Sequence, residues 1–438
     1  MKQISISDWK KIYQERLTTA EEAIKLIKSG DRISTGHSVG EPTHIIDALV
    51  ANHTSYKDVE ICHMLPMGSA NYAEPEMQGH FRHNALFVGG KTRKAIAEGR
   101  ADFTPSFFSQ IPLIWGRTLP LDAAIITVSP PDEHGYCSLG VSVDYSKHAV
   151  ENAKVVIAQV NAYMPRTLGD CFVHISQMDA IVEHDQPLLT LAPPAISDVE
   201  KAIGENCASL VRDGDCLQLG IGAIPDAVLL FLKDKKDLGI HTEMFSDGVV
   251  ELVEAGVINN SKKNFNNGKM VACFLMGTQR LYDFVNNNPM VAMHPASYTN
   301  DPYIASRNDN LVAINSCIQV DLLGQVCSET VGTTQISAVG GQVDFVRASA
   351  MSNGGRCIIA MPSTAKGGTV SKIVPTLDYG AVVTTSRYEV EYIITEHGIA
   401  NLKYRTVHDR ARMLIDIAHP NFREELKVEF EKRFNVKY

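Results

Sequence analysis

The stretch CLQLGIGAIPDAV (216–228) decides the fold. A mostly apolar run of four residues is followed by two glycines, Gly220 and Gly222, and then by a mostly apolar run that opens with Pro225. Proline suits the first turn of a helix, because its φ is already helical and its missing N–H has no partner there. The stretch therefore predicts a strand over CLQL, a turn of exposed backbone amides at 220–224, and a helix from Pro225 onward.

The glycine turn departs from a dinucleotide-binding loop. Such a loop carries a third glycine where helix and strand pack closely, and Pro225 stands in that place. Free N–H groups at the start of a helix attract an anion or a developing negative charge. The turn therefore predicts oxyanion or phosphate binding by the backbone of Gly220, Ile221, Gly222, Ala223 and Ile224.

The composition is that of a globular protein of two domains. The chain has 438 residues, of which 45% are apolar and 21% are charged. A net charge of −9 argues against a nucleic-acid partner, which would require a basic face. The longest apolar runs, such as AAIITV at 123–128, are too short to cross a bilayer, so no membrane partner is expected.

The cysteines and the opening residues indicate the compartment. Nine cysteines stand singly, without a CxxC pair, which favours reduced and mostly buried thiols. The opening residues MKQISISDWKK contain no apolar segment of the kind that a secretory signal needs. The sequence therefore predicts a cytoplasmic protein.

The chain repeats itself. Residues 29–49 resemble residues 213–232, since both contain Gly-Asp, an apolar strand, a glycine turn, a proline and a helix. A second pair matches 122–161 with 311–341, which is followed by the apolar run 356–362. Two related α/β halves explain this pattern.

A proline-rich break, QPLLTLAPPAISDVE (186–200), separates the halves and predicts an N-terminal domain 1–192 and a C-terminal domain 193–438. Strands alternate with helices in both, which predicts two related open α/β domains with mostly parallel sheets. His37 and an extra residue interrupt the glycine turn of the first half. The second half is therefore expected to carry the chemistry.

An acidic residue follows the glycine turn. Glu243 stands in IHTEMFSDG (240–248), 23 residues after Gly220. A parallel strand beside CLQL would bring it to the same sheet edge as the turn, beyond the carboxyl ends of the strands, where open α/β sheets bind ligands. From the residues alone, Glu243 is either a hydrogen-bonded structural carboxylate or a catalytic one. Asp247 is expected to cap the next helix.

Six ordered segments carry a resemblance that covers essentially the whole chain. They are LGIGAIPDAV (219–228), HTEMFSDGVVELVEAGVI (241–258), AINSCIQVDLLGQV (313–326), GGQVDFVRAS (340–349), MPSTAKGGTVSKIVP (361–375) and TTSRYEVEYIITEHGIANLKYRTVHDRARMLIDIAHPNFREEL (384–426). With them the chain resembles the acetyl-CoA hydrolase/transferase family, the class I-like CoA-transferases, and within it most of all the transferases that use 4-hydroxybutyrate. The resemblance favours the catalytic interpretation of Glu243.

The resemblance implies a reaction. CoA would pass from acetyl-CoA, or another acyl-CoA, to 4-hydroxybutyrate in a ping-pong sequence, with Glu243 as the nucleophile that carries a glutamyl-CoA thioester. Acyl-CoA and carboxylate molecules are then substrates, no cofactor is bound permanently and no metal is needed. A homodimer or homotetramer is expected on the same ground.

The resemblance also implies the rest of the site. Amides of the turn 220–224 and of Gly341 surround CoA and the reacting carbonyl, Lys366 contacts CoA, and Asn315 matches an asparagine nearby. Glu396 corresponds to a second active-site acid. His397 stands where many relatives have tyrosine or glutamine, which leaves open whether it faces the acceptor pocket.

Alternatives stay open. The reaction can instead be that of a butyryl-CoA or succinyl-CoA:acetate CoA-transferase, or of an acetyl-CoA hydrolase, because no motif separates transfer from hydrolysis. A nonenzymatic CoA-binding regulator is the alternative outside the enzymes. Phe107 and Phe108 are expected either to line the acyl pocket or to pack in the core.

Overall fold

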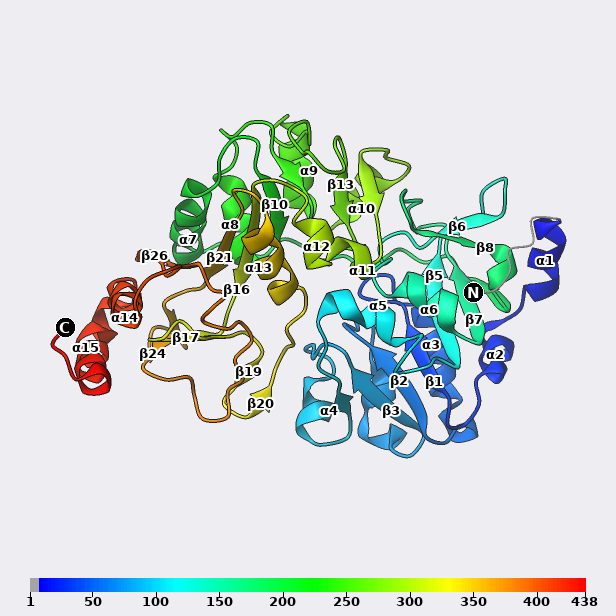
Figure 1. The fold of residues 1–438 in the computed structure, drawn as a ribbon. Helices are drawn as coiled ribbons and strands as arrows, with labels where there is room; N and C mark the ends of the chain where they lie inside the picture. Colours follow the sequence, from blue (N-terminus) through cyan, green and yellow to red (C-terminus); the bar gives the residue numbers. More distant parts are fainter. Residues whose placement is uncertain (1–7) are drawn as a thin grey trace. The chain divides into compact units, whose positions relative to one another are not determined.

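Two sheets of mostly parallel strands organise the chain, each in a unit of its own (Figure 1). The computed structural model describes residues 8–438. The expectation drawn from the opening residues rests mainly on 1–7, which lie outside the described part. Nowhere in residues 8–438 is a helix long and apolar enough to cross a membrane.

The first unit contains the described residues up to Leu191 together with Val271–Thr299, and the second contains Ala192–Met270 and Asn300–Tyr438. A single boundary at 192/193 therefore misses the segment Val271–Thr299. Backbone pairing draws this segment into the first unit, where the N–H groups of Val143 and Asp144 donate to the carbonyl of Cys273. Pairing between segments so far apart along the chain leaves no local pattern in the sequence.

The sheet of the first unit has seven strands, all parallel, in the order β4-β3-β2-β1-β5-β7-β9. They are β1 (Arg32–Thr35), β2 (Val59–His63), β3 (Phe81–Ala85), β4 (Asp102–Phe103), β5 (Ala123–Val128), β7 (Val155–Val160) and β9 (Ala180–Glu183). Every residue of β5 is buried, which explains why AAIITV is continuously apolar.

Helices and short strands complete the first unit. They are α1 (Trp9–Arg16), α2 (Ala20–Ala23), α3 (Thr43–Ala51), α4 (Arg93–Ala97), α5 (Ile111–Ile114), β6 (Tyr136–Ser138), α6 (Ser146–Asn152), β8 (Phe172–His174), β14 (Phe274–Leu275), α10 (Gln279–Val285), β15 (Val291–Met293) and α11 (Ala296–Thr299). Strand β13 (Met270–Ala272) begins at the last residue of the second unit's first segment. The core of this unit packs isoleucines of the central strands, among them Ile33, Ile61 and Ile125, against Ile45 of α3.

The sheet of the second unit has six strands in the order β11-β10-β16-β21-β25-β26, and all neighbours are parallel except β25 and β26. They are β10 (Cys216–Leu219), β11 (Gly239–Ile240), β16 (Leu311–Ser316), β21 (Arg356–Ala360), β25 (Tyr392–Thr395) and β26 (Gly398–Asn401). The helices are α7 (Asp198–Ser209), α8 (Ala223–Leu230), α9 (Asp247–Glu254), α12 (Pro302–Ala305), α13 (Gln342–Met351), α14 (Val407–Asp416) and α15 (Pro420–Phe434).

Short strands lie outside this sheet. They are β12 (Met244–Phe245), β17 (Gln319–Asp321), β18 (Val326–Cys327), β19 (Thr330–Val331), β20 (Thr334–Gln335), β22 (Thr364–Ala365), β23 (Val370–Ser371) and β24 (Ile373–Val374). Helices α7 and α8 pack on each other, and α13 contacts β16 and β21 (Figure 1). The chain runs from β10 through α8 toward one edge of the sheet, and from β16 through α13 toward the other edge. Because such crossovers are right-handed, the two helices lie on opposite faces of the sheet.

The two sheets share one strand order. In each, a central strand, β1 or β10, is flanked on one side by the next strand, β2 or β11. The chain then crosses over and builds the other side with β5, β7 and β9, or with β16, β21 and β25. The two related, mostly parallel α/β halves predicted from the repeat are thus confirmed.

The opening stretch folds as predicted except at its helix start. CLQL forms β10, but α8 begins at Ala223, with Gly222 as the N-cap at φ 112°. Pro225 is therefore the third helical residue, where a missing N–H still costs nothing because the first four have no intrahelical partner. Asp247 is likewise the first residue of α9, and Ser246 is its N-cap.

Side chains fill the corresponding turn of the first unit. His37 Nδ1 lies 3.2 Å from Asp144 Oδ2, and Ser142 Oγ donates to the same oxygen at 2.8 Å. All three residues are buried, and Phe108 packs on His37 in the core. Of the two alternatives for Phe108, the structure has core packing. The nine cysteines are buried as well, as predicted.

Helices α7 and α8 approach each other at Gly204. A Cβ there would lie 2.7–2.9 Å from atoms of Ala227. Alanine favours a helix over glycine by about 1 kcal/mol, whereas overpacking costs about 1–3 kcal/mol. We therefore expect Gly204→Ala to lower the thermal unfolding midpoint, while Glu205→Ala on the exposed face leaves it unchanged. An unchanged or higher midpoint for Gly204→Ala would show that the two helices can separate without cost.

Candidate active site

Glu243 leaves the sheet beside the glycine turn. Strand β11 pairs in parallel with β10, and three residues later the chain reaches Glu243. The buried Thr242 ties the two strand ends together, since its Oγ1 accepts the Leu219 N–H at 3.2 Å and lies 3.0 Å from the Leu219 carbonyl. Leu219 directly precedes Gly220, so the carboxylate and the turn start from neighbouring points, as the sequence predicts.

A buried asparagine holds the carboxylate of Glu243. The Asn300 Nδ2 donates to the Glu243 Oε2 at 2.8 Å. Asn300 is fully buried, whereas Glu243 is only half-buried. The hydrogen bond therefore restricts the rotation of a carboxylate that is partly exposed.

Gly341 makes room for this pair. A Cβ at Gly341 would overlap both the Glu243 Oε2 and the Asn300 Nδ2. The φ of Gly341 is −95°, which any residue can adopt, so space rather than backbone conformation requires glycine here. Gly341 is also the N-cap of α13, so this helix starts beside the carboxylate.

The glycine turn forms the start of α8. Gly220, Gly222 and Ala223 are half-buried and Ile221 is 41% exposed, while Ile224 is buried. No side chain caps the helix, so the amides of Ala223 and Ile224 point out of its first turn. Together with the helix dipole they favour negative charge at this place.

Asn315 supports the strands below the turn. It lies near the end of β16, and its Nδ2 donates to the Gln218 Oε1 at 3.0 Å. Gln218 is buried and stands two residues before Gly220. Asn315 therefore has a partner in β10, while Asn300 is the asparagine that binds the Glu243 carboxylate.

Glu396 and His397 follow β25 on the same sheet edge. Glu396 accepts the Ser363 N–H at 2.8 Å and the Ser363 hydroxyl at 2.5 Å. His397 Nε2 lies 3.6 Å from the Glu396 Oε1, and partial burial lowers the pKa of His397 although Glu396 raises it. Strand β25 is four places from β11, which at about 4.8 Å per strand separates Glu396 from Glu243 by roughly 19 Å along the edge.

Lys366 lies at the tip of the hairpin formed by β22 and β23. Its side chain is exposed, and its φ of 49° is left-handed. Such a cation is accessible to an anionic group in solution. The structure thus groups Glu243, Gly341 and the glycine turn, and places Lys366, Glu396 and His397 on other loops of the unit.

Asn300 is the residue that the sequence analysis missed. It stands in TNDP, 57 residues after Glu243, where an asparagine before Asp-Pro is typical of a turn. No spacing rule relates it to Glu243, because the contact depends on how β11 and α12 are placed. Only the tertiary structure reveals it.

The fold and the site agree with one protein family. The N-terminal domain model of the acetyl-CoA hydrolase/transferase family matches residues 1–193, and its C-terminal domain model matches residues 277–430. The chain belongs to the acetyl-CoA hydrolase/transferase family. This member is 61% identical over 428 residues to the 4-hydroxybutyrate coenzyme A transferase of Clostridium kluyveri, covering 98% of this chain and 100% of the relative.

Solved structures of the family have the same fold. RipA from Yersinia pestis superposes with a TM-score of 0.94 at 40% identity, over 98% of this chain and 100% of that one. A 4-hydroxybutyrate CoA-transferase from Porphyromonas gingivalis superposes with a TM-score of 0.85 at 41% identity, over the same shares. The CoA-transferase-like α/β fold expected from the sequence is therefore confirmed.

The contact at Gly341 leads to a structural prediction. In Gly341→Ala the new methyl group takes the space of the Glu243 Oε2, so the carboxylate has to rotate away and the 2.8 Å bond to Asn300 is lost. A crystal structure of the variant checks this. Gly90→Ala, at an exposed position with nothing within 4 Å of the new Cβ and no positive φ, is a control for the substitution itself. A carboxylate that keeps its place in Gly341→Ala contradicts the prediction.

Proposed function

We propose that the chain is a CoA-transferase that moves CoA from acetyl-CoA, or another acyl-CoA, to 4-hydroxybutyrate through a covalent intermediate on Glu243. One observation carries the mechanism: the Glu243 carboxylate accepts a hydrogen bond from Asn300 and has room beside Gly341, and it follows the strand next to a turn that no side chain caps. The relatives from Clostridium kluyveri and Porphyromonas gingivalis support 4-hydroxybutyrate as the acceptor.

The first half-reaction starts at one oxygen of Glu243. The hydrogen bond from Asn300 engages Oε2, so we assign the attack to Oε1. Oε1 attacks the carbonyl carbon of the acyl-CoA thioester, and the C–S bond breaks with release of the CoA thiolate. The product is a mixed anhydride in which Oε1 joins the acyl group to Cδ of Glu243.

The thiolate then attacks Cδ of Glu243. The new C–S bond forms, the bond between Cδ and Oε1 breaks, and the free acid leaves with Oε1. The enzyme is left with a glutamyl-CoA thioester whose carbonyl oxygen is Oε2. The acceptor carboxylate reverses both steps, supplies a new Oε1 to Glu243 and leaves as its own CoA thioester.

Negative charge develops on the acyl carbonyl oxygen in one step and on Oε2 of Glu243 in the other, and a different group of hydrogen-bond donors is suited to each oxyanion. Amides at the start of α8 are suited to the oxyanion on the acyl carbonyl, since they lie beside Glu243 on the sheet edge. The Asn300 amide is suited to the oxyanion on Oε2 when Cδ is attacked. Removal of one preorganised donor costs about 3–4 kcal/mol, or roughly two to three decades in turnover.

Covalent labelling tests the proposed nucleophile. Incubation with acetyl-CoA and peptide mass mapping should find CoA on the peptide that contains Glu243. Glu243→Ala should lose the label and all transfer, whereas Glu254→Ala, an exposed residue of α9, should keep both. A label on another residue, or full transfer by Glu243→Ala, would refute the proposal.

Isotopic oxygen tests the role of Asn300. After many turnovers with a carboxylate acceptor that carries ¹⁸O in both oxygens, Glu243 of the wild type should contain one ¹⁸O, because Oε2 stays bound to Asn300. In Asn300→Ala the carboxylate rotates between turnovers, so Glu243 should take up two. Turnover of this variant should fall by roughly two to three decades, with a smaller change in KM. If Glu243 of the wild type takes up two ¹⁸O atoms, Asn300 does not keep Oε2 in place.

A further inference from the structure

A small cavity in the first unit collects polar side chains from distant parts of the chain. Its volume is about 70 Å³, and its polar lining consists of Glu41, Thr43, Thr127, Asn161 and Gln186. These residues come from the loop between β1 and α3, the first turn of α3, the ends of β5 and β7, and the segment after β9. The cavity therefore lies at the carboxyl edge of the first sheet, where open α/β sheets bind ligands.

The carboxylate of Glu41 is buried without a paired cation. Glu41 is 4% exposed, and its Oε2 accepts the N–H groups of Met67 and Gly68 at 3.0 and 2.8 Å. No basic side chain in the described part of the chain forms an ion pair with it. Burial raises the pKa of Glu41 to about 7, although the two N–H groups lower it, and the nearby charges of Asp47 and Lys91 have opposite effects. A buried carboxylate is costly unless a positive charge compensates it.

The carboxylate, a hydroxyl and an amide lie close together in this cavity. A Cβ on Gly68 would lie 3.1 Å from both oxygens of Glu41 and 3.0 Å from Cγ2 of Thr43, so these two side chains face the same point. The Nε2 of Gln186 donates to the Oγ1 of Thr43 at 2.6 Å. Asn161 holds the backbone of Gln186, since it accepts the Gln186 N–H at 3.2 Å and donates to the Gln186 carbonyl at 2.8 Å. Oxygen atoms of three side chains are thus held within one small space.

Thr127 adds a hydroxyl without a partner. It is 4% exposed and lines the same cavity, and its Oγ1 forms no hydrogen bond with the described residues. Buried hydroxyl groups in native proteins are nearly always hydrogen-bonded, so an unpartnered one indicates a bound ligand or water. The cavity is lined by no arginine, lysine or histidine. A lining of carboxylate, hydroxyl and amide oxygens suits a hard cation rather than an anion.

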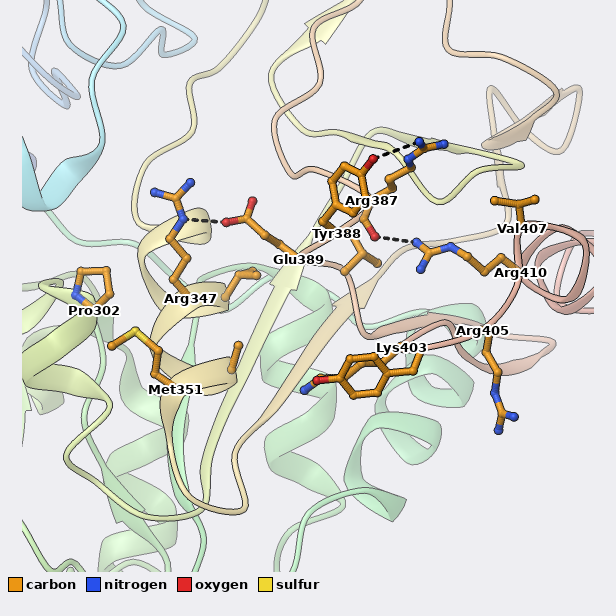
Figure 2. Close-up of a pocket in the computed structure, with 14 residues that line it drawn as sticks. Pro302, Arg347, Met351, Arg387, Tyr388, Glu389, Lys403, Arg405, Val407 and Arg410 are labelled. Atoms are coloured by element: carbon orange, nitrogen blue, oxygen red, sulfur yellow. Dashed lines mark hydrogen bonds and ion pairs between the residues drawn. The ribbon is translucent and has the colours of Figure 1, made fainter.

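The larger groove of the second unit offers no such common point. Five cations line it, Arg347, Arg387, Lys403, Arg405 and Arg410. Figure 2 shows the guanidinium groups of Arg387 and Arg405 on opposite sides of this groove, and Arg410 donates to three backbone carbonyls. These side chains do not surround one ligand, in contrast to those around Glu41.

We propose that the cavity binds a monovalent cation, K⁺ or Na⁺, through the Oε1 of Glu41 and the oxygens of Thr43, Thr127 and Gln186. The two N–H groups on Oε2 leave Oε1 for the ion. One carboxylate balances one positive charge, whereas a divalent ion would keep a buried charge without compensation. A cavity of about 70 Å³ holds the ion together with one or two water molecules, since a water molecule in the liquid takes about 30 Å³.

Thermal unfolding of the whole protein tests for the ion. The midpoint is measured at about pH 8, above the pKa of Glu41, in the chlorides of K⁺, Na⁺ and N-methyl-D-glucamine at one ionic strength. An ion that binds the folded state stabilises it by mass action, and the organic cation is too large for the cavity. The midpoint should therefore be roughly 2–4 °C higher in K⁺ or Na⁺. The more stabilising of the two identifies the ion.

Matched variants assign the effect to the cavity. Glu41→Gln keeps the shape of the side chain but removes its charge, and it should abolish the difference between the salts. Thr127→Val removes one hydroxyl and should raise the ion concentration needed for half of the effect roughly tenfold. Glu76→Gln, the same change at an exposed position of the first unit, should keep the difference of the wild type.

Crystallography of the wild type locates the ion without any variant. A crystal grown with Tl⁺ in place of K⁺, or with Na⁺ if Na⁺ stabilises more, should show the ion next to the Oε1 of Glu41. A cavity that contains only water, or a midpoint that is the same in all three salts, overturns the proposal. A salt effect that persists in Glu41→Gln overturns it as well, because the ion then binds elsewhere. Covalent labelling of Glu243 is a separate readout, so the proposed reaction is tested independently.

Discussion

The hydrogen bond between Asn300 and Glu243 is the contact on which the proposed chemistry depends. It is 2.8 Å long, one partner is fully buried, and Gly341 leaves space for both groups, because a Cβ there would overlap them. A carboxylate is a weak nucleophile, so its orientation toward a thioester matters more than its basicity. Rigid support of this kind is what a covalent mechanism on a carboxylate requires.

The edge strand that carries Glu243 is supported from below. Strand β11 has only two residues, and Lys263 closes its end by donating to the carbonyls of Ile240 and Lys269 at 2.8 and 2.7 Å. Burial lowers the pKa of Lys263, and its stem packs on Gly239. A covered edge keeps the strand in register, so Thr242 and Glu243 leave the sheet at a defined point.

The repeat explains where the site is. Both sheets change direction between a central strand and its neighbour, and open α/β sheets bind ligands beyond the carboxyl ends of strands at that point. In the second unit this point has the glycine turn after β10 and Asn315 in β16. In the first unit a buried network of His37, Ser142 and Asp144 occupies the equivalent loop. One topology thus has an open turn in one copy and a packed one in the other.

Local patterns in the sequence were sufficient to predict the strands CLQL and AAIITV, the glycine turn, the parallel pairing beside it and the repeat, because each depends on neighbours along the chain. They placed Glu243 near the glycine turn, since its spacing from Gly220 is that of one crossover, and the family resemblance then favoured it as catalytic. The start of α8 was misjudged by two residues, because proline is tolerated throughout the first turn of a helix. Only the tertiary structure decided that Asn300 binds Glu243, that Val271–Thr299 joins the first unit, and that five cations line one groove. These features join residues far apart in the chain, and packing rather than local preference brings them together.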